Sequence, residues 1–407
     1  MPTFKQKHIL TNQFYRLKRT KNYKENIQMK KILFIVNIDW FFESHRLEIA
    51  KKAIELGYEV HIGCKNTGRF SFFESLGMKT HNINFSRSDT NLKKNFQIIR
   101  ELKRIISLVN ADICHFITIK PVLFGGVISL LNFKYISIYS ITGLGSSFLA
   151  KGTISKLRSY IFLKVYSHIF KKKNAFVIFQ NSTDLRDIYQ HCNKNVTNFK
   201  IIAGSGVDLN IFKPEYKNFD GSLKVVMASR VLKDKGVREY FSAANKIKEK
   251  FDRDVDFYFY GDQDPDNPTS LTKSDLNKLN INNFVKISGF SSEINKVLAE
   301  AHLFVLPSYR EGFPKVVMEA SASGCISLVS DVPGCRDAIV VGETGFLFKE
   351  KSSKSIEFVL EQCLNDRPLL SEMSKLCRIH AEKFFSVTKI VDEHMQVYEK
   401  VMRCNVS

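Results

Sequence analysis

The sequence lacks the features that define several common protein classes. Its eight cysteines include no C-x-x-C pair, which argues against a zinc site or a redox-active disulfide. The longest apolar run, Pro121 to Phe133, contains two glycines and falls short of the ~18–20 residues that span a bilayer. The first residues contain no apolar block of the kind that secretory signals carry. We therefore expect reduced, mostly buried thiols in a cytoplasmic protein without a transmembrane helix.

Acidic residues are scarce relative to basic ones. The chain has 41 Asp and Glu against 61 Lys and Arg, which gives a formal net charge of +20. Such an excess indicates an anionic partner, and nucleic acid, an anionic membrane surface and a phosphorylated substrate all qualify. Charge alone does not choose between them. The hydrophobic content of 44% is typical of a globular protein with large cores.

The pattern along the chain predicts an α/β fold in two parts. At 407 residues the chain exceeds the ~250–300 residues of one ordinary core. Short β-branched and aromatic runs alternate with helical periods, which is typical of parallel sheets covered by helices. We expect two doubly wound Rossmann-like domains facing a cleft. The expected segments are a basic, poorly ordered leader (1–28), an N-terminal acceptor-binding domain (29–205), a C-terminal nucleotide-sugar-binding domain (206–385) and a C-terminal helix returning to the N-terminal domain (386–407).

Two cations and a helix start lie close together after one predicted strand of the second domain. Arg230 ends the strand at 223–229, and Lys235 and Gly236 follow at the entry to the helix at 237–251. Ligands of doubly wound sheets bind outside the carboxyl ends of the strands. A helix N-terminus with Arg and Lys beside it suits phosphate oxygens. The spacing is also compatible with a solvated charged turn.

A second motif lies after the strand at 303–307. Glu311 falls in the loop and Glu319 in the first turns of the following helix, with Gly312, Phe313 and Pro314 in the interval. Glycine allows a ligand to approach the backbone closely, and proline suits the first turn of a helix. A carboxylate at such a position can accept hydrogen bonds from paired sugar hydroxyls.

The run from Glu311 to Glu319 resembles the E-x7-E motif of retaining GT-B glycosyltransferases of family 4. Arg230, Lys235 and the later Asp331-Val-Pro-Gly segment fall in the order of that family, and the resemblance extends from Lys31 to the C-terminus. It implies that Arg230 and Lys235 bind the donor diphosphate, that Glu311 contacts the donor sugar and that Glu319 binds the ribose. Backbone groups near Gly312 and Phe313 would assist.

The N-terminal half departs from many family members, because Asn37 to Arg46 replaces a glycine-rich loop. It resembles a bacterial surface-polysaccharide branch, whose members include enzymes that add N-acetylhexosamine, often in α-1,3 linkage, to undecaprenyl-diphosphate-linked sugars. The resemblance implies a catalytic His facing the reacting sugar, although a lone His in an apolar strand also suits a core. The candidate residues of this half are His115 for catalysis, Gly143 for donor binding, and His45, Arg46, Lys120 and Thr142 for the acceptor.

The segment from Lys151 to Lys173 is basic and aromatic. It carries seven basic residues and no acidic one, interleaved with Tyr160, Phe162, Tyr166 and Phe170. A helix of this kind suits contact with anionic lipid, and its aromatic side is equally compatible with a core position. The candidate membrane-contacting residues are Lys156, Arg158, Lys164, Lys171 and Lys172.

The resemblance implies a retaining hexosyltransferase that moves a hexose or N-acetylhexosamine, with GalNAc in α-1,3 linkage preferred. The donor would be a UDP-sugar and the acceptor a lipid-linked glycan, on the inner face of the bacterial cytoplasmic membrane. No D-x-D pattern persuasively marks a metal site, because Asp262 and Asp264 run into Pro265. We expect no metal or other cofactor and no nucleic-acid partner. A nucleotide-sugar epimerase or hydrolase of the same fold and a basic nucleic-acid-binding protein are the alternatives.

Overall fold

The computed structural model describes residues 29–85, 92–129, 131, 135–144, 153–191, 198–265 and 267–404. The predicted leader lies outside these residues. In the N-terminal half the elements are β1 (Lys31–Ile38), α2 (Asp39–Glu55), β2 (Glu59–Lys65), α3 (Phe70–Ser75), β3 (Lys79–Asn82), α4 (Leu92–Val109), β4 (Ile113–Ile117), α5 (Ile119–Ser129), β5 (Ile136–Ile141), α6 (Thr153–Phe170), β6 (Ala175–Phe179), α7 (Ser182–His191) and β7 (Phe199–Ile201).

The C-terminal half repeats the alternation of strands and helices. Its elements are β8 (Leu223–Ala228), the 3-10 turn η2 (Lys233–Lys235), α8 (Val237–Phe251), β9 (Val255–Tyr260), α9 (Lys273–Leu279), β10 (Val285–Ile287), α10 (Ile294–Glu300), β11 (Leu303–Leu306), α11 (Lys315–Ala322), β12 (Ile326–Ser330), the 3-10 turn η4 (Arg336–Ala338), β13 (Gly345–Phe348), α12 (Ser353–Asn365), α13 (Arg367–Phe384) and α14 (Val387–Cys404).

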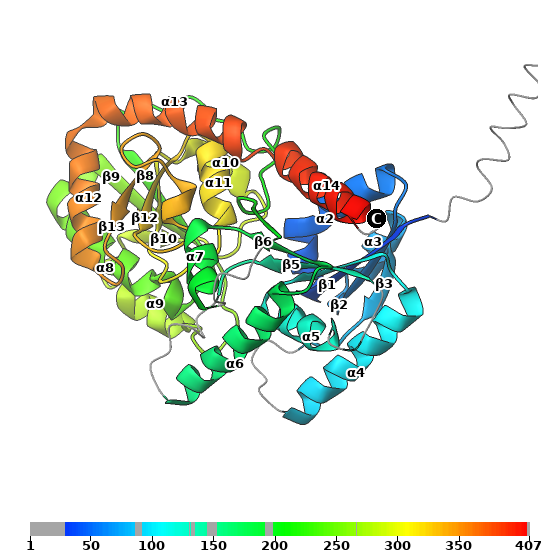
Figure 1. Ribbon diagram of the computed structural model, residues 1–407. Coiled ribbons are helices and arrows are strands. Elements are labelled where there is room, and N and C mark those ends of the chain that lie inside the picture. The colour runs from blue at the N-terminus through cyan, green and yellow to red at the C-terminus, as the bar shows by residue number, and fades with distance from the viewer. Residues whose placement is uncertain are drawn as a thin grey trace, which may run out of the picture.

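The strands form two parallel sheets, one from each half of the chain. The first has seven strands in the order β3-β2-β1-β4-β5-β6-β7, and the second has six in the order β10-β9-β8-β11-β12-β13. Helices cover both faces of each sheet (Figure 1). Strands covered on both sides read as continuous apolar runs, and β1, β4 and β6 are such runs. The predicted α/β class with two doubly wound sheets is confirmed.

Helices α4, α5 and α6 cover one face of the first sheet, and α2 and α14 cover the other (Figure 1). The last helix, α14, therefore packs on the first sheet although it follows the second. Its apolar residues share a core with β1, β2 and α2, and Ile390, Val397 and Tyr398 are among the buried members of that core.

Helix α2 begins at Asp39, directly after β1. The carboxylate of Asp39 is fully buried and accepts hydrogen bonds from the backbone N–H and the hydroxyl of Thr67, each at 2.5 Å. Burial raises the pKa of Asp39, but hydrogen bonds from Thr67, Arg69 and Trp40 outweigh it, so the net pKa lies below the ordinary value. This carboxylate fixes the start of α2 to the loop that follows β2.

A buried polar cluster joins β4, α2 and α14. His115 is fully buried, with Nδ1 2.8 Å from the hydroxyl of Tyr398 and Nε2 2.7 Å from the hydroxyl of Ser140. Burial lowers its pKa well below the ordinary value. Both ring nitrogens are thus committed inside the core, and the prediction that His115 is catalytic is wrong for this reason.

Arg46 belongs to the same cluster. Its side chain is only 1% exposed, and it donates to the carbonyl of His45 at 2.7 Å. Burial lowers its pKa to about 10, against the opposing effect of Tyr398. The prediction that Arg46 binds the acceptor is therefore also wrong, because the guanidinium lies within the protein beside α14.

A buried ion pair and a hydrogen bond connect the two halves of the chain. Arg310, which follows β11, donates to Asp184 of α7 at 2.7 Å, and the Asp184 side chain is 0% exposed against 13% for Arg310. Next to this pair, the Asn181 amide donates to the carbonyl oxygen of Gly312 at 2.7 Å. These contacts hold the two halves so that the carboxyl ends of the two sheets face each other.

Glycines let the two backbones meet at the same place. A Cβ on Gly312 would lie 2.0 Å from the carbonyl oxygen of Thr142, and a Cβ on Gly143 would lie 3.0 Å from the Cα of Gly312. Gly334 packs on the other side, where a Cβ would lie 2.4 Å from the carbonyl oxygen of Gly312. Only residues without a side chain fit this contact.

In the described part of the chain, none of the helices is both long enough and apolar enough to cross a bilayer. The six buried cysteines that the structure describes are free thiols. Burial raises their pKa, as for Cys114 and Cys377. These thiols belong to the cores.

We predict that acid weakens the docking of α14. His394 is 1% exposed, and burial, together with the nearby Arg46, lowers its pKa to about 3. The unfolded chain binds this proton near pH 6.5, so the free energy of unfolding should fall by about 2 kcal/mol per such group between pH 6.5 and pH 5. His394→Gln should remove that share of the pH dependence in urea unfolding. His168→Gln, at an exposed position, is the matched control, and an unchanged pH dependence in His394→Gln would contradict the prediction.

We also predict that Arg310→Met lowers the free energy of unfolding by about 3 kcal/mol, because it leaves the buried Asp184 carboxylate without its cation. The double variant Arg310→Met/Asp184→Asn should recover part of the loss, since no unpaired charge then stays buried. Urea unfolding of the two variants and of Asp184→Asn alone measures the coupling. Strictly additive effects of the two substitutions would argue against this pair as the connection between the halves.

Candidate active site

A cleft of about 790 Å³ lies between the two halves of the chain. Residues of both halves line it: Asn37, Ile38, Trp40, Lys65, Thr67 and Phe85 from the first, and Ala228, Ser229, Arg230, Tyr260, Gly261, Asp262, Gln263, Asp264, Pro265, Phe290, Ser291 and Ile294 from the second. The second group comes from segments after β8, β9 and β10, at the carboxyl ends of neighbouring strands. This is the edge at which doubly wound sheets bind ligands.

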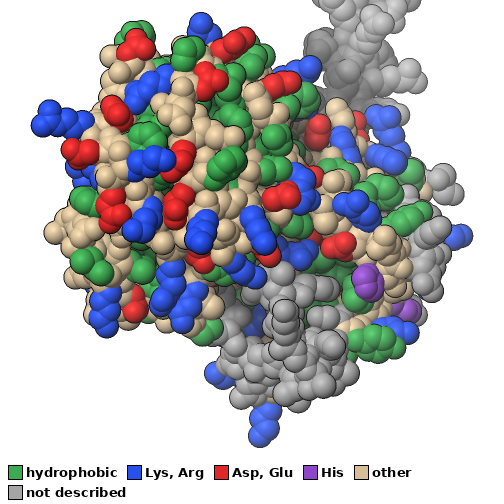
Figure 2. All heavy atoms as spheres, turned by 90° about the vertical axis from the view of Figure 1, so that its left-hand side faces the viewer, with side chains coloured by type: hydrophobic (Ala, Val, Ile, Leu, Met, Phe, Trp, Pro, Cys, Tyr) green, Lys and Arg blue, Asp and Glu red, His purple; other side chains and the backbone are tan. Residues whose placement is uncertain are grey.

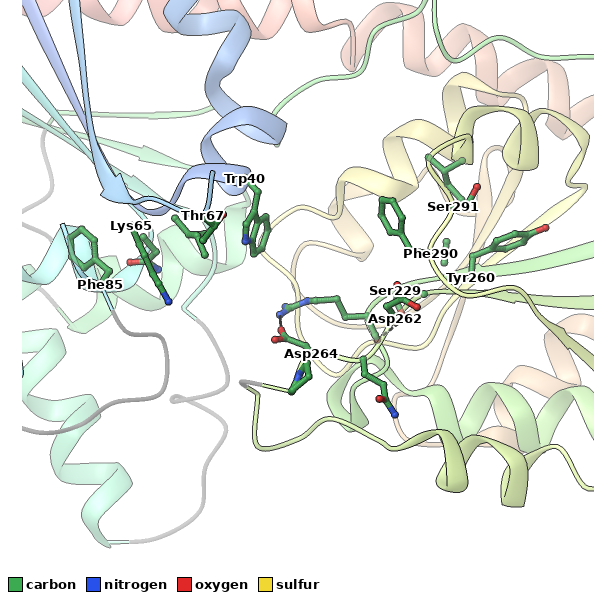
Figure 3. A pocket seen from close by; sticks show the side chains of 18 residues that line it. Trp40, Lys65, Thr67, Phe85, Ser229, Tyr260, Asp262, Asp264, Phe290 and Ser291 are labelled. Carbon is green, nitrogen blue, oxygen red and sulfur yellow. Dashed lines mark hydrogen bonds and ion pairs between the residues drawn. The ribbon is translucent and has the colours of Figure 1, made fainter. Parts of the chain in front are cut away.

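Arg230 lies in this cleft, just after β8. Its side chain is 45% exposed, and one guanidinium nitrogen lies 2.5 Å from the carboxylate of Asp264. Trp40 enters the same space from the start of α2 (Figure 3). A cation therefore stands in the cleft where the sequence predicted it.

Lys235, five residues after Arg230, forms an ion pair with Glu311. Lys235 ends η2, directly before Gly236, whose φ of 73° lies in the left-handed region. A Cβ at Gly236 would lie 2.1 Å from the carbonyl oxygen of Pro307, so the glycine lets the turn pack against the end of β11. The Lys235 ammonium donates to the Glu311 carboxylate, and both side chains are mostly buried, at 18% and 14% exposure.

Glu319 lies in α11, the helix that follows the loop of Glu311. It is 9% exposed, and burial raises its pKa against the opposing charge of Lys315. The Lys315 ammonium lies 3.6 Å from Glu319 and donates to the Ser44 carbonyl oxygen at 2.9 Å. This lysine links α11 to α2 across the two halves, a contact that the sequence did not predict.

Three predicted binding residues, Thr142, Gly143 and Gly312, lie where the two halves meet. Gly143 and Thr142, after β5, pack on the backbone of Gly312. Phe313 packs edge to face on Phe385, with ring centroids 5.7 Å apart. The assignments of Gly143 to the donor and of Thr142 to the acceptor stay predictions.

The remaining acceptor candidates lie on the first half. The ring of His45 stacks on Phe41 at 4.3 Å, and burial, Arg46 and Lys315 lower its pKa to about 3. Lys120 lies in the first turn of α5 and is half-buried. Thr118, just before it, has a φ of 74°, which a β-branched residue rarely adopts. Strained backbone of this kind clusters at binding sites, and no residue pattern near Thr118 indicates it.

The candidate membrane residues of the segment ending at Lys173 divide into three groups. Lys164 and Lys171 are exposed. Lys172 instead donates to the carbonyl oxygen of Ser129 at the end of α5, and burial lowers its pKa. This contact joins the segment after α6 to the end of α5, and the assignment of Lys172 to the membrane stays a prediction. The side chains of Lys156 and Arg158 lie outside the described residues.

Sequence reasoning missed the aromatic lining of the cleft. Phe290, after β10, is 74% exposed, and Tyr260 and Trp40 line the same space (Figure 3). Exposed aromatic rings at the mouth of a pocket suit the flat face of a base or sugar. The sequence contains an aromatic residue after Gly289, but a single sequence does not show whether that side chain is exposed.

In the described residues, no group of three His, Cys, Asp or Glu side chains is arranged to hold a metal ion. The arrangement instead offers two cations, each beside a carboxylate, and a further buried carboxylate at Glu319. Preorganised cations of this kind stabilise negative charge that develops on a leaving diphosphate.

Two family models match the chain, one for each half. The model described as glycosyl transferase 4-like matches residues 31–181, and the model described as glycosyl transferases group 1 matches residues 210–379. Among curated relatives, the chain is 28% identical over 348 residues to the N,N'-diacetylbacillosaminyl-diphospho-undecaprenol alpha-1,3-N-acetylgalactosaminyltransferase of Campylobacter jejuni, covering 81% of this chain and 87% of the relative.

Solved structures share the fold. Sucrose-phosphate synthase from Thermosynechococcus elongatus matches with a TM-score of 0.76 at 16% identity, over 92% of this chain and 99% of that one. The Anabaena HepE protein in complex with UDP-glucose matches with a TM-score of 0.70 at 18% identity, again over 92% and 99%. The predicted GT-B architecture is confirmed, and the chain belongs to the group 1 glycosyltransferases, with a glycosyl transferase 4-like domain at its N-terminal end.

Proposed function

We propose that this glycosyltransferase moves a hexose or N-acetylhexosamine from a UDP-sugar to an undecaprenyl-diphosphate-linked sugar, with retention at the anomeric carbon. The observation that carries the proposal is the cation of Arg230 in the cleft, followed five residues later by Lys235, which pairs with Glu311. A diphosphate would meet the two cations, and its sugar would lie toward Glu311. Glu319, in the helix that follows the loop of Glu311, is the proposed partner of the ribose hydroxyls.

The donor class rests on chemistry and on a structural neighbour. Two cations at the carboxyl end of a parallel sheet suit a diphosphate, and the exposed aromatic rings of Phe290 and Trp40 suit a base. The structure of the HepE protein contains UDP-glucose. We infer a UDP-sugar donor and no requirement for a metal ion.

In the proposed reaction, an acceptor hydroxyl oxygen forms a bond to the anomeric carbon while the bond from that carbon to the diphosphate oxygen breaks. The departing diphosphate takes up the acceptor proton on the same face of the sugar, which gives retention. Arg230 and Lys235 stabilise the charge on the leaving oxygen, a contribution of electrostatic preorganisation. Glu311 orients the sugar through its hydroxyls.

The acceptor and linkage are proposed by analogy with a relative. The Campylobacter jejuni enzyme is named as an alpha-1,3-N-acetylgalactosaminyltransferase acting on an undecaprenol-diphosphate-linked sugar. We therefore propose GalNAc in α-1,3 linkage within surface-polysaccharide synthesis. His45, Lys120 and Thr142, on the first half, are the proposed acceptor contacts.

A lipid-linked acceptor implies contact with the inner membrane surface, and the layer of α4 and α6 suits it. Helix α4 presents the exposed cations Arg100, Lys103 and Arg104 between Phe96 and Leu108, which are 69% and 65% exposed. On the other side of α5, α6 presents Tyr160 and Ile161, which are 58% and 50% exposed. By contrast, basic and acidic side chains are intermingled on the face of the second half seen in Figure 2. Cations flanked by exposed apolar side chains favour binding to anionic lipid.

We predict that Arg230→Ala and Glu311→Gln each lower kcat by about 100-fold or more, as loss of one group that stabilises the transition state does. The assay offers UDP-GalNAc, UDP-GlcNAc, UDP-Gal, UDP-Glc and GDP-sugars to a lipid-diphosphate-linked sugar, and the product's anomeric configuration is read by NMR. We expect transfer from a UDP-sugar, with retention and with the same rate in EDTA.

Lys375→Ala, at an exposed position of α13, is the control and should keep full activity. Undiminished turnover in Arg230→Ala or Glu311→Gln would show that the site is wrongly assigned. Release of free sugar or an epimer from donor alone, with no transfer, would instead indicate a hydrolase or epimerase.

We predict that the protein binds phosphatidylglycerol vesicles and not phosphatidylcholine vesicles, and that Arg100→Glu/Lys103→Glu/Arg104→Glu lowers this binding by about 100-fold or more. The estimate assumes ~1 kcal/mol per basic residue near an anionic surface. Vesicle sedimentation at several salt concentrations measures it. The matched control reverses three exposed lysines on the second half, Lys278, Lys354 and Lys375. Equal losses in the two triple variants would mean that net charge, and not α4, determines binding.

A further inference from the structure

Asp264 is held firmly beside Arg230 by the segment that carries it. The stretch after β9 runs back along the stretch after β8, where Val231 N–H donates to the Asp262 carbonyl at 3.0 Å and Leu271 N–H donates to the Val231 carbonyl at 2.9 Å. The backbone N–H of Asp264 donates to the Ser270 hydroxyl at 3.2 Å. These backbone contacts hold the segment that carries the Asp264 carboxylate next to Arg230.

The ion pair engages only part of the Arg230 guanidinium. One nitrogen lies 2.5 Å from one carboxylate oxygen, the Asp264 side chain is 15% exposed and the Arg230 side chain is 45% exposed. Asp264 lies at the cleft with Trp40 opposite it (Figure 3). A guanidinium has five N–H donors, so it can turn from one oxyanion to another without leaving the cleft.

Both cations of the proposed diphosphate site have a carboxylate partner. Lys235 pairs with Glu311, which the proposed function assigns to the sugar, and Arg230 pairs with Asp264, which has no assigned role. A diphosphate that binds both cations has to compete with both carboxylates. Because like charges a few ångströms apart repel, Asp264 also opposes the diphosphate directly.

We propose that Asp264 and the nucleoside diphosphate compete for the guanidinium of Arg230, so that each arrival or departure of the diphosphate exchanges one anionic partner for another. The proposal rests on the proposed function, because it takes the diphosphate to bind at Arg230. As UDP leaves, the guanidinium returns to Asp264 and is never left unpaired. Asp264 thereby limits the affinity for the product and favours its release. It is a positioning residue, because it acts through Arg230.

The test is calorimetric titration of the full chain with UDP. Removal of one carboxylate charge about 6 Å from a phosphate should tighten binding by roughly 3-fold to 10-fold at low salt, and less at high salt. We expect this tightening in Asp264→Asn and again in Asp264→Ala, with product inhibition by UDP strengthened by the same factor. Glu382→Gln removes the carboxylate of another arginine pair, with Arg378 at 2.7 Å on α13, and should leave UDP binding unchanged.

The outcomes separate this inference from the function on which it rests. Unchanged or weaker UDP binding in both Asp264 variants, with thermal unfolding like that of the wild type, would overturn the inference and leave the donor assignment standing. Tighter binding in Glu382→Gln as well would overturn it too, because net charge would then explain the effect. Failure of the wild-type chain to bind UDP would overturn the donor assignment itself, and the inference with it.

Discussion

The buried pair of Arg310 and Asp184 is the contact on which the geometry of the cleft depends. A carboxylate with no exposed surface is costly unless a cation and further hydrogen bonds accompany it, and Asn181 supplies one of these at 2.9 Å. Asn181 also reaches the Gly312 carbonyl oxygen, directly beside Glu311. The same few atoms that join the halves therefore place the first residue of the E-x7-E motif. A small shift at this joint would move Glu311 relative to everything on the first half.

The sequence predicted the sheets well because their strands are covered on both faces. Strands of this kind are nearly continuous apolar runs, and those at β8 and β11 were located to within a residue or two. Arg230 and Glu311 lie after β8 and β11, as the sequence predicted, because these strands are easily recognised. Their roles stay predictions. The start of α2 is not predictable from a local pattern, because Asp39 is held there by Thr67, 28 residues away.

The sequence was misleading where a side chain's role depends on distant segments. His115 and Arg46 are polar residues near strand and helix ends, and both are buried against α14, which no pattern near residue 46 or 115 reveals. The segment around Lys172 is basic and aromatic, as lipid contacts often are, yet the Lys172 ammonium donates to the carbonyl oxygen of Ser129. Phe290 looks like an ordinary core residue and is 74% exposed. In each case exposure is set by how elements pack, and that information is not carried by residue type or spacing.

The return of α14 to the first sheet orders the events of synthesis. The hydrogen bond between His115 and Tyr398 spans 283 residues. The face of the first sheet that α14 covers therefore stays uncovered until almost the whole chain has been made. At ~5–20 residues per second, the interval between the end of β7 and the end of α14 lasts roughly 10–40 s. During that time the second half can fold, while the first half exposes an apolar face to chaperones. The half made first is thus the half completed last.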